Sequence, residues 1–120
     1  MTNMYGNGAR GVATKLHAQL VRARGVCERC GSTTNLQCAH IVSRGFAATR
    51  TDLDNAWCLC ATDHAYLTAE PFEHVLFAHK TKGEAGYEAL RRKAREGVGK
   101  KVDWKSEVAR LRAIAKEWEL

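Results

Sequence analysis

Apolar residues recur at helical spacing near both ends of the chain. In residues 9–24 they return every four positions, at Val12, Leu16 and Leu20. This spacing predicts a helix with one apolar face, and Gly25 is a natural stop after it. Near the other end, Asp103 is suited to cap a final helix. The apolar stripe of that helix has 4-3-4-3 spacing and consists of Trp104, Val108, Leu111, Ala115 and Trp118.

The middle of the chain has short apolar runs instead of this helical period. Residues 36–42 (LQCAHIV) and 55–60 (NAWCLC) are predicted as two strands, with a loop between them. A helix is expected to begin in residues 61–67. Pro71 suits the first turn of another helix. Gly83 and Gly86 are expected to interrupt that helix before a further helical stretch.

Length and composition fit one soluble globular domain of 120 residues. The hydrophobic share is 45% and the charged share 27%, which excludes a wholly disordered, collagen-like or fully coiled-coil chain. No run approaches the roughly 18 apolar residues of a membrane helix. The first residues, MTNMYGNGARG, lack the apolar core of a signal peptide. We therefore expect a cytoplasmic protein without membrane contact.

The net charge of +6 favours a polyanionic partner. Nucleic acid is the commonest such partner, and an acidic membrane is the weaker alternative. Many small basic proteins bind neither, so the charge alone changes the picture only modestly. The cysteines change it more.

The chain has five cysteines, an odd number that argues against a disulfide framework when no secretion signal is present. Cys27-x-x-Cys30 followed by glycine has the form of a zinc knuckle, in which a tight turn directs two thiolates at one ion. Cys60-x-x-Asp63 repeats the spacing 30 residues later. These four residues are the predicted structural zinc ligands. The alternatives for the fourth position are Cys38, Cys58 and His64.

Three segments together resemble the HNH endonucleases, a family with a ββα-metal core. They are CERCG, LQCAHIVSR and DNAWCLCATDH, and they cover residues 27–64. The three signature letters fall on His40, Asn55 and His64. The flanking helices are similar to those of phage-type members. The resemblance implies an α+β fold in one domain of residues 1–120, with a zinc-stapled ββα core at 26–68 and helical flanks at 9–24 and 71–120.

The resemblance also assigns roles to single residues. His40 would be the general base, since a neutral imidazole suits this task near pH 7. His64 would hold a divalent ion such as Mg²⁺, Mn²⁺, Ni²⁺ or Zn²⁺. Asn55 would brace the loop and orient His40. Arg44 and Arg50 in that loop could clamp DNA phosphates.

The implied activity is metal-dependent cleavage of DNA with little sequence preference. A monomer would make nicks, and double-strand breaks would require a weak dimer or a second visit. Phage-type relatives act with DNA-packaging machinery, which implies a phage terminase as a partner.

Two positions depart from the family pattern. Asp63 stands where the fourth zinc ligand is normally cysteine, and Ala39 stands where many members have a ligand of the catalytic metal. The nearest carboxylates that could replace that ligand are Asp52 and Asp54. Both departures favour the main alternative, a non-catalytic zinc-stabilised module that binds nucleic acid without cutting it. Another alternative is a zinc-dependent scaffold that docks through its last helix.

The remaining distinctive side chains are expected to be structural. Cys38 and Cys58 are interpreted as small packed residues, and Trp57 as part of the core. Trp104 and Trp118 are expected to be buried in the core or an interface. No catalytic role is expected for the other three histidines, which lie on predicted helices: His17, His74 and His79.

Overall fold

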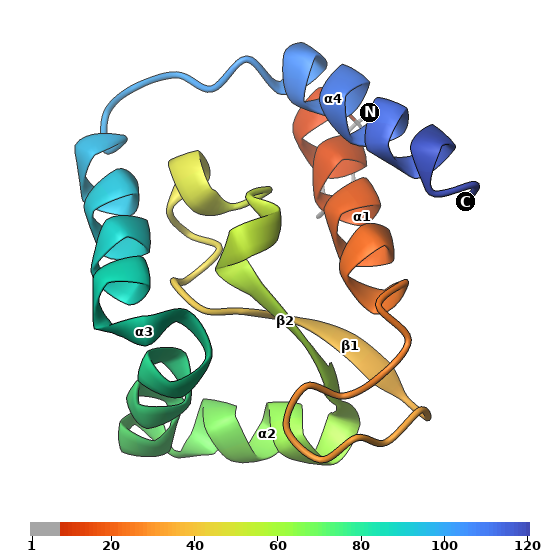
Figure 1. The fold of residues 1–120 in the computed structure, drawn as a ribbon. Coiled ribbons are helices and arrows are strands. Elements are labelled where there is room, and N and C mark those ends of the chain that lie inside the picture. Colours follow the sequence, from red (N-terminus) through yellow and green to blue (C-terminus); the bar gives the residue numbers. More distant parts are fainter. Residues whose placement is uncertain (1–7) are drawn as a thin grey trace.

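Two short strands lie at the centre of the fold in the computed structural model, which describes residues 8–120 (Figure 1). Strand β1 (Leu36–His40) pairs antiparallel with β2 (Ala56–Cys60), and Cys38 lies opposite Cys58. The prediction of two strands is confirmed, but the first one is shorter than expected. It ends at His40 because the next two residues bond to Asn55 instead of a strand. The Ile41 amide donates to the Asn55 carbonyl at 3.0 Å, and the Val42 amide to the Asn55 side chain at 2.8 Å.

Helices surround this sheet (Figure 1). Within the described residues there are four helices and two short 3₁₀ turns, so the fold class is α+β as predicted. The helices are α1 (Ala9–Arg22), α2 (Ala61–Ala69), α3 (Pro71–Glu96) and α4 (Trp104–Glu117), and the turns are η1 (Ala47–Thr49) and η2 (Leu53–Asn55).

Helix α3 contains one interruption instead of the two predicted. Gly83 has φ 74° and ψ 165°, which ends one helical segment and starts the next. This region of backbone space is essentially reserved for glycine. Gly86 lies within the second segment and has ordinary helical backbone geometry. The prediction at Gly86 is wrong because a glycine weakens a helix without necessarily breaking it.

The sheet is covered on both faces, so every residue of β2 is buried. Cys58 faces Val21 of α1, whereas Trp57 and Leu59 face a core shared with α2 and α3. The indole Nε1 of Trp57 donates a hydrogen bond to Thr81 Oγ1 at 2.9 Å. The prediction that Trp57 belongs to the core is confirmed.

The first and last helices pack on each other (Figure 1). Ala13 and Leu20 of α1 contact Val108 and Leu111 of α4, and all four are buried. The predicted stripe of α4 is therefore confirmed at its centre. Trp118 is not buried in this core: it is the C-cap residue of α4, directly after Glu117, and is 44% exposed.

A polar network joins α4 to the loop after η1. Glu107 accepts a hydrogen bond from Thr51 Oγ1 at 2.7 Å and pairs with Arg110 at 2.9 Å. Arg110 in turn donates to the Thr51 carbonyl at 3.0 Å.

Among the described residues, no helix has both the length and the hydropathy needed to cross a bilayer.

Candidate functional site

The loop between α1 and β1 turns tightly enough to bring two cysteines together. Gly31 has φ 80°, a left-handed conformation that glycine adopts without strain. The Gly31 amide donates to the Cys27 carbonyl at 2.9 Å, and the Cys27 amide to the Ser32 carbonyl at 2.7 Å. These bonds fold residues 27–32 into a knuckle with Cys27 buried and Cys30 exposed.

The second pair of predicted ligands comes from the start of α2. Cys60 is the residue that caps this helix, and Asp63 lies in its first turn. The ligand atoms of Cys27, Cys30, Cys60 and Asp63 all lie within 4.8 Å of one another. The structure therefore brings together the four residues predicted as zinc ligands. None of the alternatives for the fourth position, Cys38, Cys58 and His64, belongs to this group.

The distances within this group suit a tetrahedral ion. The sulfurs of Cys30 and Cys60 are 3.7 Å apart. Tetrahedral zinc with Zn–S bonds of about 2.3 Å separates two sulfurs by about 3.8 Å. Cys27 Sγ lies 3.2 Å from Asp63 Oδ2. Three thiols and one carboxylate at this spacing form a group that could hold a metal ion and is compatible with zinc.

Arg29 holds the carboxylate of this group in place. Its guanidinium forms an ion pair with Asp63 Oδ1 and stacks on the ring of Tyr66, 4.6 Å from the centroid. Burial alone would raise the pKa of Asp63, but hydrogen bonds from Cys30, Cys27 and Arg29 lower it below its usual range. The carboxylate is thus anionic, as a metal ligand must be. Sequence analysis missed Arg29. Its position between Cys27 and Cys30 was a usable signal, because the predicted fourth ligand, Asp63, is an acid that a nearby cation can pair with.

His40 lies at the end of β1 in a state suited to accept a proton. Its Nε2 is 2.8 Å from the carbonyl oxygen of Arg50. A carbonyl can only accept a hydrogen bond, so Nε2 carries the proton and Nδ1 retains a lone pair. Burial lowers the pKa of His40, and the positive charges of Arg44 and Arg50 lower it further. The ring is therefore neutral at pH 7.

His17 lies beside His40, which sequence analysis did not anticipate. The two rings stack with centroids 5.2 Å apart and planes at 28°. His17 is completely buried, and its Nε2 donates to the Asp52 carbonyl at 3.0 Å. Burial lowers its pKa to about 4. The available signal was its position on the apolar face of α1, four residues after Ala13 and three before Leu20.

Cys38 completes a second group of candidate ligands with these two histidines. Its sulfur is 3.8 Å from His17 Nδ1. One ligand atom from each of His17, Cys38 and His40 lies within 4.8 Å of the other two. The interpretation of Cys38 as a packed residue is thus incomplete, because it is half-buried and faces two imidazoles.

Asn55 lies at the end of the loop that precedes β2. Its side chain is buried and bonds only to backbone groups. Oδ1 accepts from the Val42 amide at 2.8 Å, and Nδ2 donates to the carbonyls of Val42 at 2.9 Å and Thr49 at 3.1 Å. These bonds fix the chain directly after His40 and so fix the end of β1. Both functional atoms of the amide are engaged, which favours bracing over metal binding.

His64 lies in the first half of α2. Its Nδ1 is 2.7 Å from Gln37 Oε1, so Nδ1 donates and Nε2 keeps its lone pair. Burial lowers its pKa. Among residues 8–120, however, His64 belongs to no group of three metal-ligating side chains. A catalytic ion at His64 would thus have at most one further ligand from a His, Cys, Asp or Glu side chain among these residues.

Neither predicted substitute for the missing ligand joins His64. The Asp52 carboxylate caps η2 through the Asp54 amide at 2.9 Å and pairs with Lys93 at 2.7 Å. Asp54 is exposed. Asp52 is therefore already engaged, because Lys93 of α3 and the η2 turn share its two oxygens.

The two arginines of the loop, Arg44 and Arg50, differ in exposure and in side-chain hydrogen bonding. Arg50 Nε donates to Thr14 Oγ1 of α1 at 2.8 Å, and its Nη1 to the Arg44 carbonyl at 3.1 Å. Burial lowers its pKa, with Arg10 and Arg44 adding to the effect. Arg44 and Arg10 are exposed. Arg44 and Arg50 therefore place two positive charges near His40, and Arg10 adds a third near Arg50.

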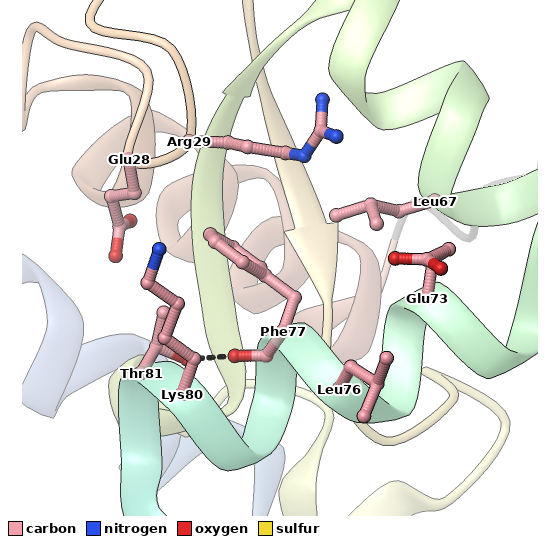
Figure 2. Close-up of a pocket in the computed structure, with 8 residues that line it drawn as sticks. All are labelled: Glu28, Arg29, Leu67, Glu73, Leu76, Phe77, Lys80 and Thr81. Atoms are coloured by element: carbon pink, nitrogen blue, oxygen red, sulfur yellow. Dashed lines mark hydrogen bonds between the residues drawn. The ribbon is translucent and has the colours of Figure 1, made fainter.

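Two clefts flank these groups. The larger, about 620 Å³, lies between the knuckle and α3 and has no histidine in its lining; Arg29 extends across it toward Leu67 (Figure 2). The smaller, about 480 Å³, has both His40 and His74 in its lining and is the better candidate for chemistry. Its other lining residues are Ile41, Val42, Ser43, Leu67, Thr68, Pro71, Val75 and Tyr87.

Comparison with known proteins identifies no relative of this chain. No protein-family model, curated protein or solved structure matches it. The resemblance of residues 27–64 to a known family therefore rests on its motifs.

Proposed function

We propose that this protein is a metal-dependent endonuclease of the HNH type that hydrolyses DNA phosphodiester bonds. The ββα unit would be β1, β2 and α2, stapled by zinc on Cys27, Cys30, Cys60 and Asp63. The observation that carries the proposal is the state of His40. It is a neutral imidazole at the end of β1, its Nε2 is fixed on a backbone carbonyl, it lines a cleft, and the charges of Arg44 and Arg50 act on it.

His40 supplies the base for this reaction. Its Nδ1 takes a proton from a water molecule as that water attacks the phosphorus atom. The bond between phosphorus and the leaving oxygen breaks, and that oxygen takes a proton from solvent. General base catalysis of this kind contributes roughly 10²- to 10⁴-fold to rate.

Two further signature residues support His40. Asn55 is a positioning residue that fixes the loop carrying the Arg50 carbonyl. His64 would offer Nε2 to a divalent ion, with DNA phosphate and water as the other ligands. Such an ion, when bound, stabilises charge on the phosphate.

The charge distribution favours a polyanionic substrate. Arg44 is exposed near His40, Arg10 is exposed near Arg50, and the net charge is +6. Contacts to phosphates are indifferent to base sequence and weaken with salt. The proposed enzyme therefore nicks DNA with low sequence preference. A phage terminase as its partner follows only from the family resemblance.

The test is nicking of supercoiled plasmid by the purified protein with Mg²⁺, Mn²⁺, Ni²⁺ or Zn²⁺. Wild type is compared with His40→Ala and with His79→Ala, a matched control on the exposed face of α3. We expect metal-dependent nicking that falls at least 100-fold in His40→Ala and is unchanged in His79→Ala. Zinc content and DNA binding must be equal in all three proteins. Nicking that survives His40→Ala would contradict the assigned base.

Two observations favour a second candidate function, a zinc-stabilised module that binds nucleic acid without cutting it. Ala39 offers no ligand, and His64 belongs to no ligand group among the described residues. This candidate predicts salt-dependent DNA binding and no nicking with any of the four metals. The plasmid assay therefore separates the two functions.

A further inference from the structure

The side chains around His40 form a feature that the proposed nuclease does not use. His17 comes from α1, whereas Cys38 and His40 come from the same face of β1, two residues apart. Imidazole and thiolate are the ligands that zinc and its neighbours in the transition series prefer. A nuclease that uses His40 as its base does not require the buried His17 or Cys38 next to it.

Both imidazoles are arranged as metal ligands usually are. Histidines that bind metals almost always donate their other ring N–H to a carbonyl or carboxylate, which fixes the ring and its tautomer. Here Nε2 of His17 donates to the Asp52 carbonyl at 3.0 Å, and Nε2 of His40 to the Arg50 carbonyl at 2.8 Å. Each ring therefore keeps its lone pair on Nδ1.

The sulfur is at the right distance to share an ion with them. Cys38 Sγ lies 3.8 Å from His17 Nδ1. Tetrahedral zinc, with bonds of about 2.1 Å to nitrogen and 2.3 Å to sulfur, separates such atoms by about 3.6 Å. The ligand atoms of all three residues lie within 4.8 Å of one another.

We propose that His17, Cys38 and His40 form a second metal site that takes a borderline divalent transition metal such as Zn²⁺. The three protein ligands leave a fourth position for water. Cys38 loses its thiol proton to solvent when the ion binds. Access is from the side of Cys38 and His40, which are half-buried, whereas His17 is completely buried.

A consequence for activity follows, and it rests on the proposed function. An ion on Nδ1 of His40 occupies the lone pair that would accept the proton of water. Metal at this second site would therefore inhibit cleavage, even though metal in the cysteine knuckle stabilises the fold. The binding proposal itself does not require the protein to be an enzyme.

The test measures binding and omits DNA, so its outcome is independent of nuclease activity. The full chain is first given one equivalent of Zn²⁺ to fill the cysteine knuckle, and is then titrated with Co²⁺. Absorption by thiolate-to-cobalt charge transfer reports binding through a cysteine. The variants are Cys38→Ser and His17→Gln. The matched control is Cys58→Ala, since Cys58 lies opposite Cys38 in the sheet but belongs to neither ligand group.

We expect wild type and Cys58→Ala to bind one further equivalent of Co²⁺ with the charge-transfer band. In Cys38→Ser the band should be absent, and in His17→Gln binding should be at least tenfold weaker. Cys38→Ser keeps the proposal testable if the buried His17→Gln variant fails to fold. The proposal is overturned if wild type binds no further equivalent. It is also overturned if Cys38→Ser retains the band, because the cobalt would then have entered the knuckle.

Discussion

Hydrogen bonds decide which ring nitrogen of His17, His40 and His64 is available. His17 and His40 both direct Nε2 at a carbonyl oxygen, so both present Nδ1 to their neighbours. His64 is held the opposite way, by a hydrogen bond from Nδ1 to Gln37. Chemistry at the end of β1 is thus controlled by hydrogen bonds to main-chain and amide groups. Asn55 is the side chain that holds most of this main chain in place.

Replacing Asn55 by alanine should therefore destabilise the protein strongly. The change removes three hydrogen bonds and leaves the buried polar groups of Val42 and Thr49 without that partner. We expect the free energy of unfolding to fall by about 2–4 kcal/mol. Urea denaturation followed by circular dichroism measures it. The control is Asp54→Ala at the exposed neighbouring position, where the change should stay below about 0.5 kcal/mol. Equal stability of the two variants would contradict the bracing role.

At the scale of secondary structure, each element is fixed by a small number of side-chain contacts. Helix α3 bends at Gly83, and the indole of Trp57 bonds to Thr81 just before that bend. Helix α4 is tied to the loop after η1 through Glu107 and Thr51. These contacts join segments that are distant in sequence. Their removal should change stability without touching either ligand group.

The two glycines of α3 offer a matched pair. Gly83→Ala should destabilise, because φ 74° and ψ 165° strain any residue with a Cβ by about 1–3 kcal/mol, although the added atom meets nothing within 4 Å. Gly86→Ala should stabilise by up to about 1 kcal/mol, because the position is helical and the nearest side-chain atom is 3.4 Å away. Thermal unfolding of both variants measures the two signs. A stabilised Gly83→Ala would show that the helix straightens at no cost.

The network at Glu107 should contribute to acid sensitivity. The hydrogen bond from Arg110 lowers the pKa of Glu107 below its usual 4.5, against the opposing effect of burial. A carboxyl whose pKa is lowered by folding stabilises the folded state above the unfolded pKa. That contribution is lost as the pH falls through the folded pKa.

Glu107→Gln should accordingly cost about 1 kcal/mol at pH 7. The difference from wild type should shrink as the pH falls below about 4.5. Urea denaturation at pH 7, 4 and 3 provides the comparison, with Glu117→Gln on the exposed end of α4 as the control. A difference that is constant across this range would rule out the ionised carboxylate as its cause.

At the scale of the whole molecule, the cysteine knuckle and the core on one face of the sheet are a single unit. Cys27 and Cys60 pack in the same cluster as Trp57 and Leu59. An ion held by the four ligands would thus fasten the knuckle to β2 and α2. The contacts between α1 and α4 lie in another cluster that contains none of these ligands.

Removal of metal by a chelator should therefore loosen one part of the molecule more than the other. We expect the melting temperature to fall by about 10 °C or more, as for small domains whose metal site forms with the fold. Amide exchange should rise most in residues 27–32 and in α2. Added Zn²⁺ should restore both properties. A melting temperature that is insensitive to chelation would contradict a stabilising ion at this site.

Local sequence patterns were enough to predict most helices and both strands of this fold. The remainder depends on packing between elements that are distant in sequence. The spacing of Cys27, Cys30, Cys60 and Asp63 was enough to group them, because short turns and a helix start bring such residues together. The pairing of His17 with His40 was not predictable in this way. It depends on how α1 crosses the sheet, and no pattern within one element specifies that crossing. The absence of His64 from both ligand groups is likewise a property of the assembled fold.

The packing of α1 against α4 has a consequence for the newly made chain. During synthesis α1 leaves the ribosome before its apolar partner residues, Val108 and Leu111, which emerge only after the whole knuckle and both strands. The metal-binding unit can form meanwhile, whereas Leu20 has no α4 to cover it. The nascent chain thus passes through a stage in which the apolar face of α1 is exposed to solvent. During this stage aggregation or binding by a chaperone competes with completion of the fold. Translation that stalls within α4 would prolong that stage.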